Sequence, residues 1–424
     1  MSTPFGFGAG SPFDMNSLGA ALQQLGRMLQ QGEGEGAIRW TVVRDVARQA
    51  IAGSGDPVVP DAQVRAVQDA FRLSDVWLDE VITFPASTGP MHAWSRSQWL
   101  VETLPVWERI VAPIGEQMQG AVASALPALP SDPDAILQSL PENVRQMLPG
   151  GIPPEMAQMI APMMGMMQQL GSAAFSMQLG QSLGGLASEV LSSSDIGIPL
   201  TLQPTRALLP GNVADFGAGL GVPNSDVLLF VALRESAHQR LFDHVPWLRA
   251  RVIGAVEEYA RHMHVNASRL TSAMEDIDMS NPEALQDIMS RGLVEPEPTE
   301  EQRVAVARLE TLLALVEGWV DDVVTQAVGD RLASLGQLRE AIQRRRAAGG
   351  PSEKTFSTLV GMHLRPRAMR EAGTLFAALR SMRGVEQRDA LWNHPDLLPS
   401  AEDLADPLGF IETSGSSDLT PPSE

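Results

Sequence analysis

The sequence predicts a mainly α-helical protein with one short β element before its central helix. Apolar residues recur at the spacing of one helix face through most of the chain, for example at Ile38, Val42, Val46 and Ile51. Fragments compatible with β-strands are confined to residues 198–202 and 206–209, and glycine-rich turns follow them. We therefore expect helices to form the core and a small sheet to lie beside the next helix.

The composition fits a globular protein, with 44% hydrophobic residues among 424. A net charge of −20 disfavours nucleic acid and anionic membranes as partners. No apolar run reaches the roughly 18 to 20 residues that span a bilayer, and no signal-peptide pattern opens the chain. We expect a cytoplasmic protein without membrane insertion. Lys354 is the only lysine, a bias typical of GC-rich bacterial genomes.

Composition shifts divide the chain into five predicted regions. These are a flexible N-terminal tail at 1–36, an N-terminal helical region at 37–125, a proline-rich linker at 126–154, a helical domain at 155–411 and a disordered C-terminal tail at 412–424. Helices are expected within the two helical regions at 61–81, 95–125, 226–243, 245–263, 299–328 and 332–346, and two more within 352–383.

Several of these helices carry informative side chains. Trp94, Trp99 and Trp107 are interpreted as core residues, the usual role of tryptophan at such spacings. The methionine-rich stretch from 156 to 191 predicts a buried helix rather than a membrane hairpin, because proline and glutamine interrupt it. Gly180 and Gly184 put a small-residue notch on one face, where another helix can approach. The arginine-rich segment at 332–346 is interpreted as a solvated face rather than an RNA or lipid contact.

The helix at 226–243 contains an incomplete zinc-binding motif. In His-Glu-x-x-His, two histidines four residues apart bind zinc and the glutamate acts on the metal-bound water. Glu235 and His238 occupy the second and fifth places, but Arg234 stands in the first. With no cysteine in the chain, any zinc would have to use imidazole and carboxylate ligands.

A second acidic pattern lies on the helix at 299–328. Glu317 and Asp321 are four residues apart and therefore share a face. Gly318 would let another backbone come close, and an acidic pair that begins in an otherwise apolar face needs a partner.

The chain resembles the zincin-like metallopeptidase family, whose members are often named only as hydrolases and some of which are linked by name to deazaflavin coenzyme biosynthesis. The matching segments are 180–184, 233–242, 245–248, 316–321, 388–392 and 394–396. The resemblance implies a gluzincin-type fold, with His238 and Glu317 as zinc ligands, Glu235 as general base and Asp321 orienting a ligand. It also implies that substrate lies along a sheet edge at 198–209.

Arg234 departs from the family pattern, because arginine offers no lone pair to a metal at neutral pH. We expect its guanidinium to form a bidentate pair with Glu317 or Asp321 and to replace the metal. The site would then be degenerate and retained for binding a peptide or protein segment, or for structure. Removing Arg234 should in that case cost about 3 to 5 kcal/mol by leaving Glu317 unpaired.

Two alternatives stay open. His244, His262 or His264 could supply a substitute ligand, which would give an active zinc-dependent peptide hydrolase with Glu235 as general base. Otherwise Glu235 and His238 are ordinary helix residues, and only the ancestral fold is shared.

Overall fold

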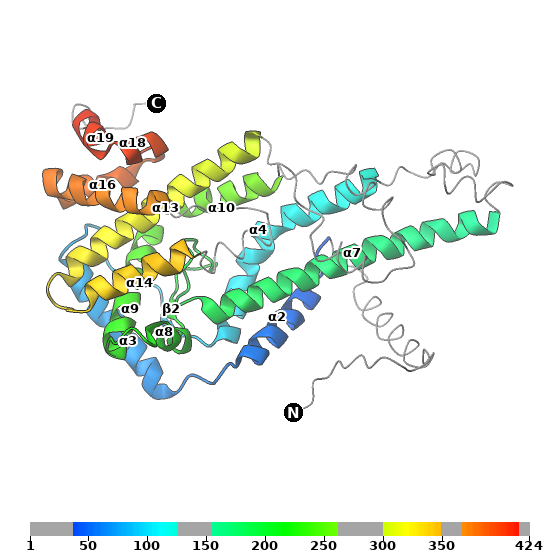
Figure 1. Ribbon diagram of the computed structural model, residues 1–424, viewed down its shortest axis with the longest axis horizontal. Coiled ribbons are helices and arrows are strands. Elements are labelled where there is room, and N and C mark those ends of the chain that lie inside the picture. Colours follow the sequence, from blue (N-terminus) through cyan, green and yellow to red (C-terminus); the bar gives the residue numbers. More distant parts are fainter. Residues whose placement is uncertain (1–36, 126–153, 262–299, 349–366, 415–424) are drawn as a thin grey trace. The chain divides into compact units, whose positions relative to one another are not determined.

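The computed structural model describes residues 37–125, 154–261, 300–348 and 367–414 (Figure 1). The chain forms two compact units, one of Met1–Trp40 with Leu129–Ser176 and the other of Thr41–Ala128 with Met177–Glu424. The predicted tail at 1–36, the linker at 126–153 and residues 415–424 lie outside the described residues. The five predicted regions therefore stay a prediction.

The described part of the first unit is small. It contains residues 37–40 and the first part of helix α7 (Pro154–Glu189). The Ser172 hydroxyl donates to the Ala37 carbonyl oxygen at 2.8 Å, and the Arg39 backbone N–H donates to the Ser176 hydroxyl at 2.9 Å. These bonds join the start of the described chain to α7.

The second unit is built mainly from helices, which confirms the predicted fold class (Figure 1). Its helices are α2 (Trp40–Ser54, whose first residue belongs to the first unit), α3 (Asp61–Asp79), α4 (Arg96–Ala125), the end of α7, α8 (Pro210–Gly217), α9 (Asn224–His244), α10 (Pro246–Arg261), α13 (Glu300–Val328), α14 (Leu335–Ala347), α16 (Arg367–Arg383), α17 (Val385–Ala390), α18 (Ala401–Ala405) and α19 (Pro407–Ser414). Two 3₁₀ turns, η1 (Leu391–Asn393) and η2 (Pro395–Leu397), follow α17.

The sheet has two parallel strands, β1 (Met91–Ala93) and β2 (Arg206–Leu208). The prediction at 206–209 is thus confirmed, but residues 198–202 form no strand and β1 was missed. On its other side, β2 forms hydrogen bonds with the loop that precedes it. The Ser193 N–H donates to the Ala207 carbonyl oxygen, and the Leu209 N–H donates to the Leu191 carbonyl oxygen. Both edges of β2 are therefore occupied, so the substrate edge expected at 198–209 is not available on this strand.

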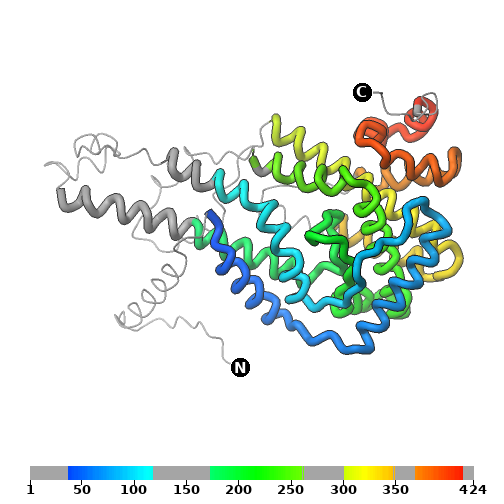
Figure 2. The backbone as a smooth tube through the Cα atoms, turned by 180° about the vertical axis from the view of Figure 1, so that it is seen from behind, coloured from blue at the N-terminus to red at the C-terminus, as the bar shows by residue number. Residues whose placement is uncertain are grey.

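Helix α9 is the centre of the second unit. It contacts α3, α8, α10, α13, α14 and β2, and all residues from Leu229 to Phe242 are buried (Figures 1 and 2). Such a helix must satisfy its polar side chains inside the protein. It starts at Asn224, two residues before the predicted start at 226, and no side chain caps it.

Glycines allow two close helix crossings. A Cβ on Gly180 would lie 2.7 Å from the Val43 carbonyl oxygen, and one on Gly184 would lie 2.7 Å from the Ala50 Cβ. A Cβ on Gly318 would lie 2.6 Å from the Ala372 Cβ. The predicted notch on α7 thus receives α2, and Gly318 admits α16 against α13, where the two helices run side by side (Figure 2).

The three tryptophans that the sequence predicts to be core residues are buried. Trp94, Trp99 and Trp107 are at most 6% exposed, as expected for core residues. None of the helices in the described part of the chain has both the length and the apolar character that crossing a membrane requires.

Candidate functional site

Two motif residues of α9 contact the carboxylate of a glutamate on α13. Arg234 and His238 lie one turn apart on α9, and Glu317 comes from α13. The Arg234 Nη2 donates to Glu317 Oε2 at 2.6 Å, while His238 Nε2 lies 3.1 Å from Glu317 Oε1. The side chains of all three are at most 7% exposed. The structure therefore brings together three of the five predicted site residues.

A second arginine, from α14, shares the same carboxylate. Arg346 Nη1 lies 2.5 Å from Glu317 Oε2, the oxygen that also accepts from Arg234. The Arg234 contact uses one guanidinium nitrogen, so the pair is not the bidentate one expected. We call Arg234, His238, Glu317 and Arg346 the Glu317 cluster.

Opposing effects set the protonation of this cluster. Burial alone would raise the pKa of Glu317, but interactions with Arg346, His238 and Arg234 hold that pKa well below its usual value. Burial lowers the pKa of Arg234, and repulsion from Arg346 lowers it further, while the attraction of Glu317 offsets these effects only in part. Glu317 raises the pKa of Arg346 in spite of burial. Glu317 is thus held as an anion by its positively charged neighbours.

Glu235 is held away from the cluster by its own set of donors. Its Oε1 accepts from the Ser193 hydroxyl at 2.5 Å and from Gln239 Nε2 at 2.9 Å. Its Oε2 accepts from the Ser194 hydroxyl at 2.6 Å and from the Ser194 backbone N–H at 3.2 Å. Glu235 is 0% exposed, so these bonds satisfy a fully buried carboxylate.

The loop before β2 positions these partners. Ser192 forms an isolated bridge with Leu208, which fixes the loop against the sheet and presents Ser193 and Ser194 to α9. Further along the loop, Gly197 has a φ of +77°, and a Cβ there would lie 3.3 Å from Glu317 Oε1. The loop therefore contacts both carboxylates of the motif.

Asp321 does not join the Glu317 cluster. It accepts from Arg339 at 2.6 and 3.1 Å through both carboxylate oxygens. The bidentate pair that the sequence predicts for Arg234 is thus formed by Asp321 with an arginine of α14.

The donor set does not fit a zinc ion. Arg234 offers no lone pair in the first ligand place, so of the implied ligands only His238 and Glu317 remain, fewer than the three protein ligands of a catalytic zinc site. His238 Nδ1 lies 2.8 Å from the Arg234 carbonyl oxygen, a contact that also orients ligating histidines, so His238 itself is not the obstacle. The described ranges contain no group of three or more His, Cys, Asp or Glu side chains placed to hold a metal. Of the candidate substitutes, His244 bonds to the Arg240 carbonyl, and His262 and His264 lie outside the described residues.

A cavity of about 430 Å³ opens next to the Glu317 cluster. Arg234, Glu317 and Arg346 line it together with Asp321, and residues of α14 and α16 form the rest of its wall. The cluster is therefore accessible to a small group.

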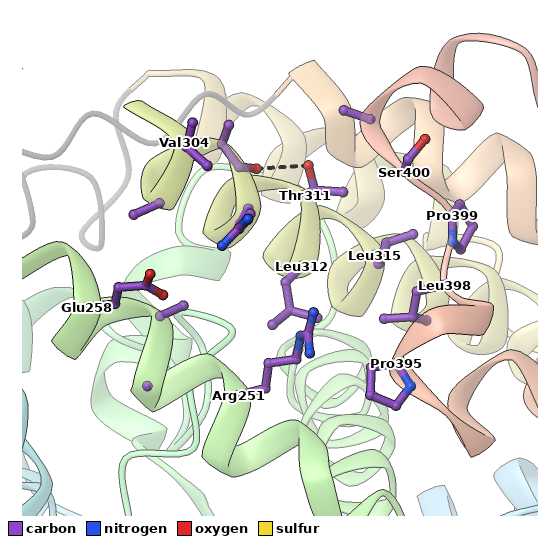
Figure 3. Close-up of a pocket in the computed structure, with 16 residues that line it drawn as sticks. Arg251, Glu258, Val304, Thr311, Leu312, Leu315, Pro395, Leu398, Pro399 and Ser400 are labelled. Atoms are coloured by element: carbon purple, nitrogen blue, oxygen red, sulfur yellow. Dashed lines mark hydrogen bonds between the residues drawn. The ribbon is translucent and has the colours of Figure 1, made fainter. Parts of the chain in front are cut away.

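A larger cavity of about 720 Å³ contains none of the motif residues (Figure 3). It lies between α10 and α13 and the turn around η2, where Leu312, Leu315, Pro395 and Leu398 give it an apolar wall. A large volume alone does not indicate a functional site, so we place the candidate site at the smaller cavity, which the motif residues line.

The sequence did not indicate four of the important residues. Arg346 belongs to the segment interpreted as a solvated face, but its side chain is 19% exposed and contacts Glu317. Ser193 and Ser194 lie in a serine run without a recognisable motif. Gln239 stands four residues after Glu235, a spacing that could have identified it.

Comparisons with known proteins give a family and a similar fold. The model of the family described as zincin-like metallopeptidase matches residues 38–411. The fold is similar to the crystal structure of a "putative hydrolase with a novel fold" from Chloroflexus aurantiacus, at 19% identity and a TM-score of 0.58, with 90% of this chain and 99% of that chain covered. No curated protein matches the chain.

Proposed function

Because this chain belongs to the zincin-like metallopeptidase family, we propose that it is a member in which an arginine-centred charge cluster has replaced the metal. In this proposal, the site serves to bind a peptide or protein segment, or to hold α9, α13 and α14 together, rather than to hydrolyse a peptide bond.

The main support for the proposal is that the Glu317 carboxylate is bonded to two arginines. The residue that would be the third zinc ligand bonds instead to Arg234, at 2.6 Å, and to Arg346, at 2.5 Å. A guanidinium at the place of the first histidine adds positive charge where a cation would have to bind. Two such groups oppose zinc more strongly than the substitution at Arg234 alone.

The contacts of Glu235 support the same proposal. A general base must present a free oxygen to a water molecule near the reacting bond. All the hydrogen bonds of Glu235 go to Ser193, Ser194 and Gln239, and its carboxylate is fully buried. Glu235 thus acts as a structural link between α9 and the loop before β2.

Restoring the family ligand tests the proposal. We expect Arg234→His alone to bind zinc weakly, because Arg346 still pairs with Glu317. Adding Arg346→Met frees Glu317, so the double variant should bind zinc at least about a hundredfold more tightly than the parent. Competition titration with a chromophoric zinc chelator measures both affinities, and Arg346→Met alone is the matched control.

Two results would contradict this proposal. One is stoichiometric zinc in the parent, which would favour the alternative of a peptide hydrolase with a non-standard metal site. The other is equal zinc affinity of the parent and the double variant, which would mean that Arg234 and Arg346 do not occupy a former metal site.

A further inference from the structure

The surroundings of the Glu317 cluster contain more positive than negative charge. Arg234 and Arg346 share one oxygen of Glu317. The nearby carboxylates already have their own partners, because Asp321 pairs with Arg339 and Asp195 with Arg345. Among the described residues here, four arginines therefore face three carboxylates, even before any charge on His238 is counted. Buried charges in proteins are normally paired, so the described residues around the cluster are one anion short of balance.

Arg234 is the cation that is least well matched. It is 6% exposed, and its guanidinium makes one hydrogen bond within the described part of the protein, although it carries five N–H donors. The lowered pKa of Arg234, caused by burial and by repulsion from Arg346, agrees with this imbalance. The same side chain lines the cavity, so a ligand that enters this space can contact Arg234.

The rest of the cavity wall fits an anion with an apolar body. Arg370 at the rim is exposed and forms no ion pair with a described residue, while the exposed pair of Arg344 and Glu340 balances itself at 3.6 Å. Ile342 and Met369 add apolar surface. A volume of about 430 Å³ lies within the roughly 300 to 1,000 Å³ of typical small-ligand sites.

We propose that this cavity binds a carboxylate group, which Arg234 and Arg346 receive at its base and Arg370 attracts at its rim. A guanidinium presents paired N–H donors that match a carboxylate. The group would come from the C-terminus of a peptide or from a small organic acid. This inference rests on the proposed function, because in an active site the zinc ion, and not the two arginines, would receive a carboxylate group.

Direct binding measurements test the inference. Isothermal titration calorimetry at pH 7 and low ionic strength would compare N-acetyl-Leu-Ala-Leu as the free acid with the same peptide as its amide, and with hexanoate. We expect the free acid to bind at least about tenfold more tightly than the amide. Hexanoate binding as tightly as the free acid would support the site and assign it to small organic acids, whereas weaker hexanoate binding would assign it to peptide C-termini.

Three variants show where the ligand binds. Arg234→Met leaves a balanced pair of Arg346 and Glu317 and should abolish the preference for the acid. Arg370→Met changes an exposed rim residue, so this variant should fold normally and bind the free-acid peptide severalfold more weakly than the parent does. Arg72→Met alters the net charge equally but removes an exposed arginine of α3 that does not line the cavity, and it should bind like the parent.

The outcomes separate this inference from the proposed function. Equal affinity for acid and amide, no binding of either, or an acid preference that survives in Arg234→Met and Arg370→Met would overturn the carboxylate site. In each case a metal-free parent would leave the proposed function standing. Stoichiometric zinc in the parent would instead remove the basis of both.

Discussion

Glu317 is more important than Arg234 for the balance of buried charge. Both Arg234 and Arg346 bond to its Oε2, so removing Arg234 still leaves Glu317 paired. The cost of about 3 to 5 kcal/mol that the sequence suggests for losing Arg234 assumed an unpaired carboxylate. The second arginine changes that expectation, because the unpaired state arises when Glu317 is lost.

We predict that Glu317→Gln destabilises the fold by about 3 to 5 kcal/mol, because two guanidinium groups lose their anion. Arg234→Met, which keeps most of the side-chain volume, should cost only about 1 to 3 kcal/mol, the range of one charge-assisted hydrogen bond. Urea unfolding measures both. Glu340→Gln, at an exposed position of the cavity rim, should show no measurable change. A larger loss in Arg234→Met than in Glu317→Gln would contradict the shared pairing.

The state of Glu235 can be tested in the same way. Glu235→Gln replaces an acceptor oxygen by an NH₂ group that faces donors from Ser193, Ser194 and Gln239. We predict a loss of stability of about 1 to 3 kcal/mol, measured by thermal unfolding. A general base of an active enzyme would give the opposite pattern, with unchanged stability and lost turnover.

The low pKa of Glu317 predicts the pH range in which the cluster is stable. Because the folded-state pKa is depressed, its stabilisation is complete above the unfolded-state value of about 4.3 and is lost as the pH falls through the folded-state pKa. The stability difference between the parent and Glu317→Gln should thus be constant from about pH 7 to 5 and shrink only below about pH 4. A difference that already shrinks between pH 7 and 5 would mean that Glu317 is not held as an anion.

At the scale of elements, glycines decide how closely the helices pack. Gly184 on α7 has no room for a Cβ next to Ala50 of α2, whereas Gly185, its neighbour, has no atom within 4 Å of a Cβ. We predict that Gly184→Ala destabilises the fold by about 1 to 3 kcal/mol. Gly185→Ala should be neutral or stabilise by up to about 1 kcal/mol, because alanine favours a helix. Urea unfolding compares the two, and equal effects would mean that α2 does not cross α7 at this notch.

The loop before β2 and helix α14 link the motif to the rest of the second unit. The loop supplies Ser193 and Ser194 to Glu235, and α14 supplies Arg346 to Glu317. Asp195 of the loop also pairs with Arg345 of α14 at 2.9 Å. Glu235 and Glu317 are therefore joined to each other through one loop and one helix.

For the whole molecule, periodic patterns predicted far more than isolated residues did. Apolar spacing predicted α3, α4, α9 and α13 to within a few residues, because a buried face leaves a regular trace in the sequence. Strand β1 has only three residues and leaves no such trace. The role of Arg346 depends on how α14 lies against α13, a tertiary contact that local sequence does not encode.

The segments that carry the family resemblance fall into two groups. Arg234, Glu235, His238 and Glu317 surround the candidate site. Three tryptophans of the resemblance segments instead form an aromatic core, in which the ring centroid of Trp392 lies 6.3 Å from that of Trp247 and 6.5 Å from that of Trp319. The chain can thus keep the family fold through its core while one residue of the motif has changed.

The metal content of the purified, chelator-free protein tests the central claim most directly. Elemental mass spectrometry of the parent, with His238→Ala as control, would measure zinc per chain. We predict a zinc content well below one per chain that does not differ between the two proteins, because Arg234 and Arg346 bond to the Glu317 carboxylate. About one zinc per chain in the parent, lost in His238→Ala, would contradict this account and show that the chain holds a metal through a ligand other than Arg234.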